Sequence, residues 1–219
     1  MSFIISGTVL NYPIYDGNVS PQARILLSEG KVNAAIAEYR RLASLGSAMA
    51  RCVLAYLELR GLPNTDVNLA EAKRLASEAL GSEPGFANYI LANVAMEERD
   101  FSKLLRLMYQ SSVGGFVPAY AALAMLFNQG VTVPPDPAFA EKMFKRAIGQ
   151  GHVPSSYLLY RLYQTGRLGT WKKVMGALMV PFSWIFLWLR TRTDLFSVKV
   201  FRHFSRRDPP MFNPHGIKD

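Results

Sequence analysis

The chain has 219 residues, half of them apolar, and a formal net charge of +9 at pH 7. This length holds one domain, or one domain with an appendage. Residues 1–160 carry 14 Lys and Arg against 13 Asp and Glu, whereas residues 161–219 carry 11 against 3, so the basic charge belongs to the C-terminal quarter. The single cysteine, Cys52, excludes an internal disulfide and fits a reducing compartment.

The first twenty residues read MSFIISGTVLNYPIYDGNVS. They contain no basic n-region, no long apolar h-region and no small-residue cleavage site, so we do not expect a secretory signal and predict a cytoplasmic main domain. We treat residues 1–20 as an N-terminal arm, whose sequence leaves open a strand-like or an unstructured conformation.

A helical pattern recurs in AMARCVLAYLELRG, PGFANYILANVAMEERD, VPAYAALAMLFNQG and VPSSYLLYRLYQTG. Each segment has a small residue, a leucine four positions later and an apolar residue three beyond that. This spacing predicts one face of a helix, and the small residue lets a neighbouring helix approach closely. The small residues are Ala50, Ala87, Ala119 and Ser155, at intervals of 37, 32 and 36 residues.

Another helix is predicted before each of these segments, joined to it by a turn that contains glycine. Gly61, Gly130 and Gly166 fit left-handed C-caps, and Asp66 and Asp136 fit N-caps or first-turn negative charge. The inward positions of the preceding helices are Ala35, Tyr39 and Leu42 before Gly46; Leu104, Met108 and Ser111 before Gly115; Ala140, Phe144 and Ala147 before Gly151; and Ala72, Ala76 and Ala79 before Glu83, which replaces the expected glycine.

The segment from Asn128 to Gly166 resembles a Sel1-like repeat (SLR), a relative of the tetratricopeptide repeat. The segment AAIAEYRRLASLGSAMARCVLAYLELRG matches the pattern nearly as well. The second and third repeats depart from it, because Glu83 replaces the turn glycine and the linker around Arg99 and Asp100 is short. The matching positions are Gly130, Val131, Asp136, Ala140, Phe144, Ala147, Gly151, His152, Leu159, Leu162 and Gly166.

The resemblance covers residues 21–168 and implies an all-α, helix-turn-helix solenoid of about four repeats. It also implies a scaffold for protein complexes, in bacteria often near membranes, in cell-surface polysaccharide synthesis or another envelope assembly. The packing of helices leads to the same architecture. A helix pair cannot bury its apolar face alone, whereas stacked pairs form one core with a concave surface. Such a groove suits a helical or extended protein partner.

The sequence shows no catalytic constellation. His152, His203 and His215 are far apart and have no metal-ligand spacing with Cys52 or a carboxylate. We expect a structural role for His152 in its turn and a buried thiol at Cys52. No glycine-rich nucleotide motif is present. We therefore predict no enzymatic activity, no cofactor and no metal site.

After Gly166 the repeat pattern stops, and Val174 begins the uncharged run VMGALMVPFSWIFLWL. As a helix these 16 residues would extend roughly 24 Å, less than the ~30 Å hydrocarbon core of a bilayer. Basic residues flank the run at both ends, which favours placing both ends on the cytoplasmic side of the membrane. A crossing helix is therefore the weakest of three interpretations. The favoured one is a monotopic element, bent at Pro181, that dips into one leaflet. In the third, the helix caps the solenoid or packs on a protein partner.

We assign residues 169–219 to an apolar and basic membrane- or partner-binding region. Its later part, DLFSVKVFRHFSRR, fits a basic amphipathic helix on anionic lipid, and alternation between Phe196 and Val200 also allows a strand. The candidate binding residues are Trp171, Lys172, Lys173, Phe182, Trp184, Phe186, Trp188, Arg190, Arg192, Phe201, Arg202, Arg206 and Arg207.

These observations predict a non-catalytic scaffold or adaptor, peripheral at the cytoplasmic face of a membrane. A protein partner would occupy the groove, and anionic lipid or an integral membrane protein would hold the C-terminal region. The alternative is a soluble regulatory protein whose basic aromatic tail binds protein or nucleic acid. Nucleic acid is disfavoured, because the phenylalanines are too dense for a stacking platform.

Overall fold

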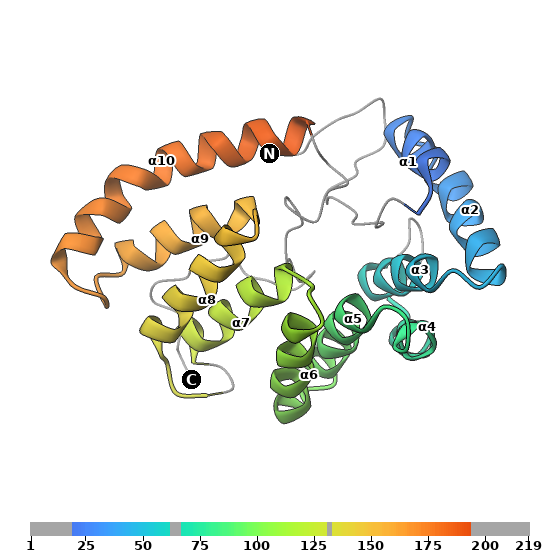
Figure 1. The fold of residues 1–219 in the computed structure, drawn as a ribbon, viewed down its shortest axis with the longest axis horizontal. Helices are drawn as coiled ribbons and strands as arrows, with labels where there is room; N and C mark the ends of the chain where they lie inside the picture. Colours follow the sequence, from blue (N-terminus) through green and yellow to red (C-terminus); the bar gives the residue numbers. More distant parts are fainter. Residues whose placement is uncertain (1–18, 62–66, 131–132, 194–219) are drawn as a thin grey trace.

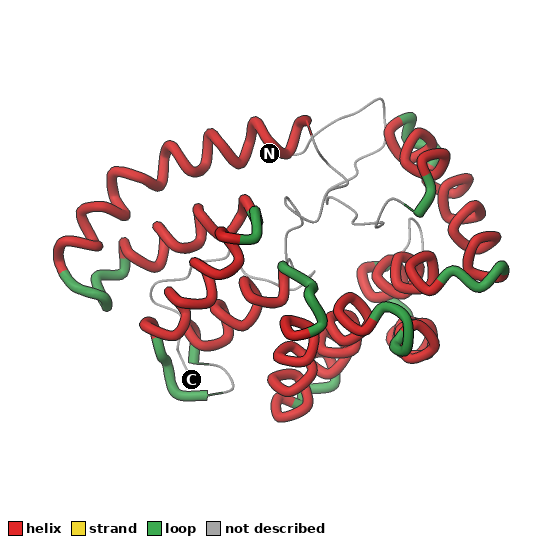
Figure 2. Tube along the Cα trace, viewed as in Figure 1, coloured by secondary structure: helices red, strands yellow, loops and turns green. Residues whose placement is uncertain are grey.

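The structure is a computed structural model that describes residues 19–61, 67–130 and 133–193. Within these ranges every regular element is a helix, so the predicted all-α class is confirmed (Figures 1 and 2). The N-terminal arm lies almost wholly outside the described residues. The helices are α1 (Pro21–Ser28), α2 (Val32–Ser44), α3 (Ala48–Arg60), α4 (Leu69–Ala79), α5 (Pro84–Glu97), α6 (Phe101–Val113), α7 (Pro118–Gln129), α8 (Pro137–Gly149), α9 (Val153–Gln164) and α10 (Thr170–Thr193).

Neighbours in sequence are also neighbours in space. Each helix from α1 to α9 contacts the next one along the chain, and α10 packs along α9. The pairs α2/α3, α4/α5, α6/α7 and α8/α9 correspond to the predicted repeats. Figure 1 shows these pairs following one another in an arc, and Figure 2 shows short connections between many of the helices. Such nearest-neighbour packing is the architecture of a solenoid.

Small side chains occupy buried positions on the inward faces of these helices. Ala50, Ala87, Ala119 and Ser155, the predicted close-approach positions, are all fully buried. The predicted inward residues of α2, α4, α6 and α8 are also buried, apart from Leu42, which is partly buried against the same core. The 3.6-residue period therefore identified the inward face of each helix correctly.

Glycines with positive φ close several turns, as the sequence predicts. Gly46, Gly115 and Gly151 have φ values of 96°, 84° and 83°, and Gly130 caps α7 in the left-handed conformation. Gly61 ends α3 with φ 81° but ψ 127°, so the left-handed cap predicted there is wrong. The predicted cap of α8 is confirmed, because the Asp136 carboxylate accepts a hydrogen bond of 2.8 Å from the Phe139 amide. These turns reverse the chain so that consecutive helices pack against one another.

The two irregular repeats close their turns differently. Glu83 has φ −126° and its amide donates to the Ala79 carbonyl over 2.9 Å, so this turn needs no glycine at that position. Before α6, Arg99 adopts φ 59°, a conformation that non-glycine residues seldom take. The Asp100 carboxylate then caps α6 at the Lys103 amide. Asp66 lies outside the described residues, and Asn68 is the residue that caps α4.

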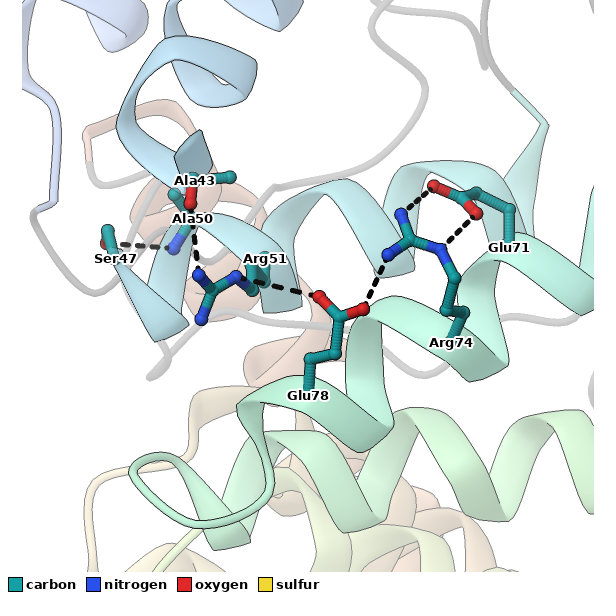
Figure 3. Close-up of polar contacts among 7 residues, drawn as sticks. All are labelled: Ala43, Ser47, Ala50, Arg51, Glu71, Arg74 and Glu78. Atoms are coloured by element: carbon teal, nitrogen blue, oxygen red, sulfur yellow. Dashed lines mark hydrogen bonds and ion pairs between the residues drawn. The ribbon is translucent and has the colours of Figure 1, made fainter. Parts of the chain in front are cut away.

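A polar network joins α2, α3 and α4 on the surface (Figure 3). Arg51 donates to the Ala43 carbonyl over 3.2 Å, and its Nε lies 3.8 Å from Glu78. Arg74 then connects Glu78 to Glu71, with which it forms two hydrogen bonds of 2.8 and 2.6 Å. Because these side chains are partly exposed, each pair stabilises the fold only modestly, and the network chiefly aligns neighbouring helices.

The helices α5 and α6 meet backbone to backbone. A Cβ atom added at Gly85 would lie 2.6 Å from the Gly114 carbonyl oxygen, which is closer than side chains approach. The Ser111 hydroxyl donates a hydrogen bond of 2.6 Å to the Gly85 carbonyl and is fully buried. Glycine is therefore required at this crossing because no side chain fits between the backbones.

We predict that Gly85→Ala lowers the free energy of unfolding by about 1–3 kcal/mol, because the added methyl group forces α5 and α6 apart. Urea denaturation followed by circular dichroism measures this change. Gly81→Ala is the matched control: its Cβ would meet nothing within 4 Å, and its φ is not positive. Equal stability of the two variants would contradict the close contact at Gly85.

Candidate interaction face on the C-terminal helix

The uncharged run forms the middle of one continuous helix, α10. The chain leaves α9 through a turn in which Gly166 and Gly169 have φ values of 74° and 101°. The Lys173 amide then donates to the Gly169 carbonyl as α10 begins. Pro181 lies inside the helix, and Figure 1 shows α10 curving along α9. The connection after α9 is thus a glycine turn, and the uncharged run that follows it is helical.

One side of α10 is committed to α9. Gly176 is buried there, and a Cβ atom at this position would lie 2.6 Å from the Tyr160 carbonyl oxygen and 2.9 Å from Tyr163 Cβ. Ser183, two turns further along, is also buried and donates to the Val180 carbonyl. Gly176 thus lets the α10 backbone rest on α9, and the small side chain of Ser183 lies on the buried side of the helix.

A buried carboxylate fastens the start of α10 to the solenoid. Glu141 on α8 accepts a hydrogen bond of 2.7 Å from the Tyr163 hydroxyl of α9. Lys172 of α10 reaches its other oxygen over 2.5 Å, and Lys145 lies 2.7 Å away on α8. Burial by itself would raise the pKa of Glu141, but the hydrogen bonds from Lys145, Lys172 and Tyr163 outweigh it and lower the pKa to about 2. One ionised carboxylate thus joins three consecutive helices.

The opposite side of α10 is apolar and exposed. Trp171 is 78% exposed, Phe182 67% and Leu178 60%. Exposed apolar residues recur at intervals of three or four, which places them on one helical face. We name this surface the α10 apolar face and define it by Trp171, Val174, Leu178, Phe182, Ile185 and Leu189.

The structure brings together some of the predicted binding residues. Trp171, Phe182, Trp184 and Phe186 are exposed on α10, as is Lys173, and Trp188 is partly buried. Lys172 is instead engaged with Glu141. The side chains of Arg190 and Arg192 are not described. Phe201, Arg202, Arg206 and Arg207 lie outside the described residues, as does the alternative strand at 196–200.

The prediction missed much of the α10 apolar face. Val174, Leu178, Ile185 and Leu189 are exposed but were not among the candidates. The signal was available in the three- and four-residue spacing from Trp171, which a search for aromatic and basic residues overlooks. Glu141 was also missed, because nothing local in the sequence indicates that a carboxylate on α8 meets a lysine 31 positions later.

Basic residues lie near the start of this face, and the sequence around them contains no acidic residue. Every charged residue from 142 to 193 is Lys or Arg, and the carboxylate that precedes this stretch is Glu141, already bound by two lysines and a tyrosine. Arg167 and Lys173, at the start of α10, are both exposed. The C-terminal end of the described solenoid therefore combines exposed apolar surface with uncompensated positive charge.

His152 and Cys52 are in the core, and His203 and His215 lie outside the described residues. His152 is buried, and its Nδ1 lies 2.7 Å from the Ser155 hydroxyl oxygen. Cys52 is fully buried, and this burial, with a smaller effect of the Glu83 carboxylate, raises the pKa of its thiol to about 12. Among the described residues, no three His, Cys, Asp or Glu side chains are grouped as metal ligands. None of the helices in the described ranges of the chain combines the length and the hydropathy needed to cross a membrane.

Acidification should remove the contribution of the ionised Glu141 carboxylate to the stability of the fold. Its pKa is lowered from 4.5 to about 2 on folding, so its stabilising effect is complete above pH 4.5 and is lost as the pH falls towards 2. The shift corresponds to roughly 3 kcal/mol. We expect the stability difference between the native chain and Glu141→Gln to shrink over this range, measured by urea denaturation at successive pH values. A difference that stays constant would show that Glu141 is not ionised in the network.

The contact at Gly176 gives a second test. We predict that Gly176→Ala pushes α10 away from α9 and lowers the free energy of unfolding by about 1–3 kcal/mol. Amide hydrogen exchange should rise in α10 first. Gly149→Ala on α8 provides the control, because its Cβ meets nothing within 4 Å. Unchanged exchange in α10 of Gly176→Ala would refute the close packing.

Comparison with known proteins bears on the fold. No protein-family model and no curated protein matches the chain. Among solved structures, it is similar to a Sel1 repeat protein from Oxalobacter formigenes, with 21% identity and a TM-score of 0.56 over 64% of this chain and 57% of that one. It is also similar to a protective antigen of uropathogenic Escherichia coli strains that displays an SLR fold, with 20% identity and a TM-score of 0.52 over 72% of this chain and 36% of that one.

This chain thus spans little more than half of the first protein and about a third of the second. At these identities the likeness concerns the fold. It agrees with the four helix pairs, the buried small residues and the glycine turns described above. The resemblance predicted from the repeats is therefore confirmed at that level: the chain has the Sel1-like repeat fold, an all-helical solenoid.

Proposed function

We propose that this chain is a non-catalytic scaffold that binds a protein partner on its repeat helices and is held at a membrane by its C-terminal helix. The membrane contact is made with lipid or with an integral membrane protein, on the cytoplasmic face. The observation that carries the proposal is the α10 apolar face, which is exposed while the helix itself is fastened to the solenoid through Gly176 and Glu141. Exposed apolar surface of this extent is typical of an interaction site.

The repeat helices supply the second half of the proposal. Stacked helix pairs present an extended surface, which suits a helix or an extended segment of another protein. Tyr120 on α7 and Tyr157 and Tyr160 on α9 are partly exposed and come from the second helices of their repeats. Tyrosine combines a large apolar area with a hydrogen-bonding group, so these three are the anchors we propose for the partner.

A setting in bacterial cell-surface polysaccharide synthesis or another envelope assembly is part of the proposal, and it rests on the resemblance of the repeats alone. The rival is a soluble regulator that binds nucleic acid or protein through its basic tail. Salt separates the nucleic-acid form of this rival from the proposal, because binding to nucleic acid weakens steeply as salt rises, whereas apolar contacts persist.

We predict that Leu178→Glu combined with Phe182→Glu moves the chain from the membrane fraction to the soluble fraction of cells that express it. Both side chains are exposed, so the helix should still form while its apolar contact is lost. Fractionation followed by immunoblotting measures the distribution, and circular dichroism checks that the fold is retained.

Val113→Glu combined with Leu45→Glu is the matched control for this experiment. Val113 is 73% and Leu45 71% exposed, at the ends of α6 and α2, so this control places the same two charges on other exposed apolar positions. It should leave the distribution unchanged. If the double variant fractionates like the native chain, α10 is not the attachment site and the proposed function loses its membrane part.

A further inference from the structure

We infer that the α10 apolar face binds an anionic lipid bilayer directly, with α10 lying in the plane of one leaflet and α9 on its water side. This inference rests on the proposed function and deepens it, because it names lipid as the partner of α10. Three features of the structure carry it: the width of the apolar surface, the commitment of the opposite side to α9, and the charge around it.

The exposed apolar surface is wider than a protein-binding seam. A helix that pairs with another helix presents a narrow stripe bordered by charged residues. On α10 the stripe is bordered by further apolar residues, with Trp184 on one side and Met179 and Phe186 on the other, all exposed. With 3.6 residues per turn, these positions cover roughly half of the helix circumference or more. From 174 to 189 the helix carries no charge. A surface that is broad and continuous matches hydrocarbon better than it matches a second helix.

The opposite side of α10 is held by protein from Lys172 to Ser183. Gly176 lies against the Tyr160 backbone of α9, Ser183 is buried two turns later, and Lys172 is bound to Glu141. Lipid can therefore reach only the outward side of this helix. A helix with protein on one side and hydrocarbon on the other lies along the membrane surface, with its apolar side chains directed into the leaflet.

The surrounding charge favours an anionic surface. Arg167 and Lys173 are exposed beside the start of the α10 apolar face, and no carboxylate occurs between Glu141 and Asp194. The Arg167 guanidinium uses one nitrogen to donate to the Asn128 carbonyl over 3.0 Å, which leaves further donors for a phosphate oxygen. Each basic residue near an anionic membrane adds a small, salt-screened attraction, so electrostatics draws the face to the membrane and the apolar contact retains it.

The chain carries its own reporter of this event. Its three tryptophans are Trp171, Trp184 and Trp188, and all of them lie on α10. Trp171 and Trp184 are 78% and 50% exposed. Transfer of these indoles from water to the bilayer interface, which tryptophan prefers, should shift the intrinsic emission to shorter wavelength. No other part of the molecule contributes tryptophan fluorescence.

The experiment mixes the purified full-length chain with vesicles of phosphatidylcholine alone, or of phosphatidylcholine with phosphatidylglycerol, and follows flotation and tryptophan emission. We expect binding and a blue shift with the phosphatidylglycerol vesicles, and quenching when the acyl chains carry bromine. Leu178→Glu combined with Phe182→Glu should weaken partitioning by roughly tenfold to a hundredfold. Lys173→Glu should weaken it several-fold at low salt and little at high salt, and the control with Val113→Glu and Leu45→Glu should match the native chain.

Three results would overturn the inference. In the first, the native chain binds neither vesicle, but the double variant still moves out of the membrane fraction of cells. A membrane protein would then hold α10, so the inference fails and the proposed function stands. If neither vesicles nor cell fractionation respond to the double variant, both fail. A blue shift that grows with protein concentration without lipid, together with a larger sedimentation coefficient, would assign the face to a second copy of the chain.

Discussion

The close approach of consecutive helices depends on small residues at their crossings. Ala50, Ala87, Ala119 and Ser155 are fully buried at equivalent places in the four second helices, so each pair can rest on the next with little intervening side chain. At Gly85 even a methyl group is too large. Because each repeat contacts only its neighbours, these crossings are repeated local constraints, and together they set the path of the solenoid.

The same constraint attaches a helix that the repeat pattern does not include. Gly176 allows α10 to rest on the backbone of α9, and Glu141 connects α8, α9 and α10 through Tyr163 and Lys172. A buried carboxylate needs such partners, since burial without them would favour its neutral form. The result is a helix whose inner side is fixed to the solenoid while its outer side, which is strongly apolar, stays in solvent.

This arrangement separates two surfaces by chemistry. The repeat helices bury mostly alanine, leucine and tyrosine and expose charged residues, several of which form ion pairs such as that between Arg74 and Glu71. The α10 apolar face has no such pairs among the described residues, and the charges near it are positive. A scaffold that engages a protein on one surface and an anionic membrane on another requires this kind of division, because a single surface cannot satisfy both partners.

The sequence by itself determined the repeated helices, because the signals for them are local. These signals are a face of small and apolar residues at 3.6-residue spacing, an N-cap such as Asp136 and a turn glycine such as Gly46. It also located the apolar run after Gly166. Only the tertiary structure decided which side of that run is exposed. A helix that is apolar all round carries no local indication of its inner side, and the choice depends on where Gly176 fits against Tyr160 and where Lys172 reaches Glu141, contacts between residues that are distant in the chain.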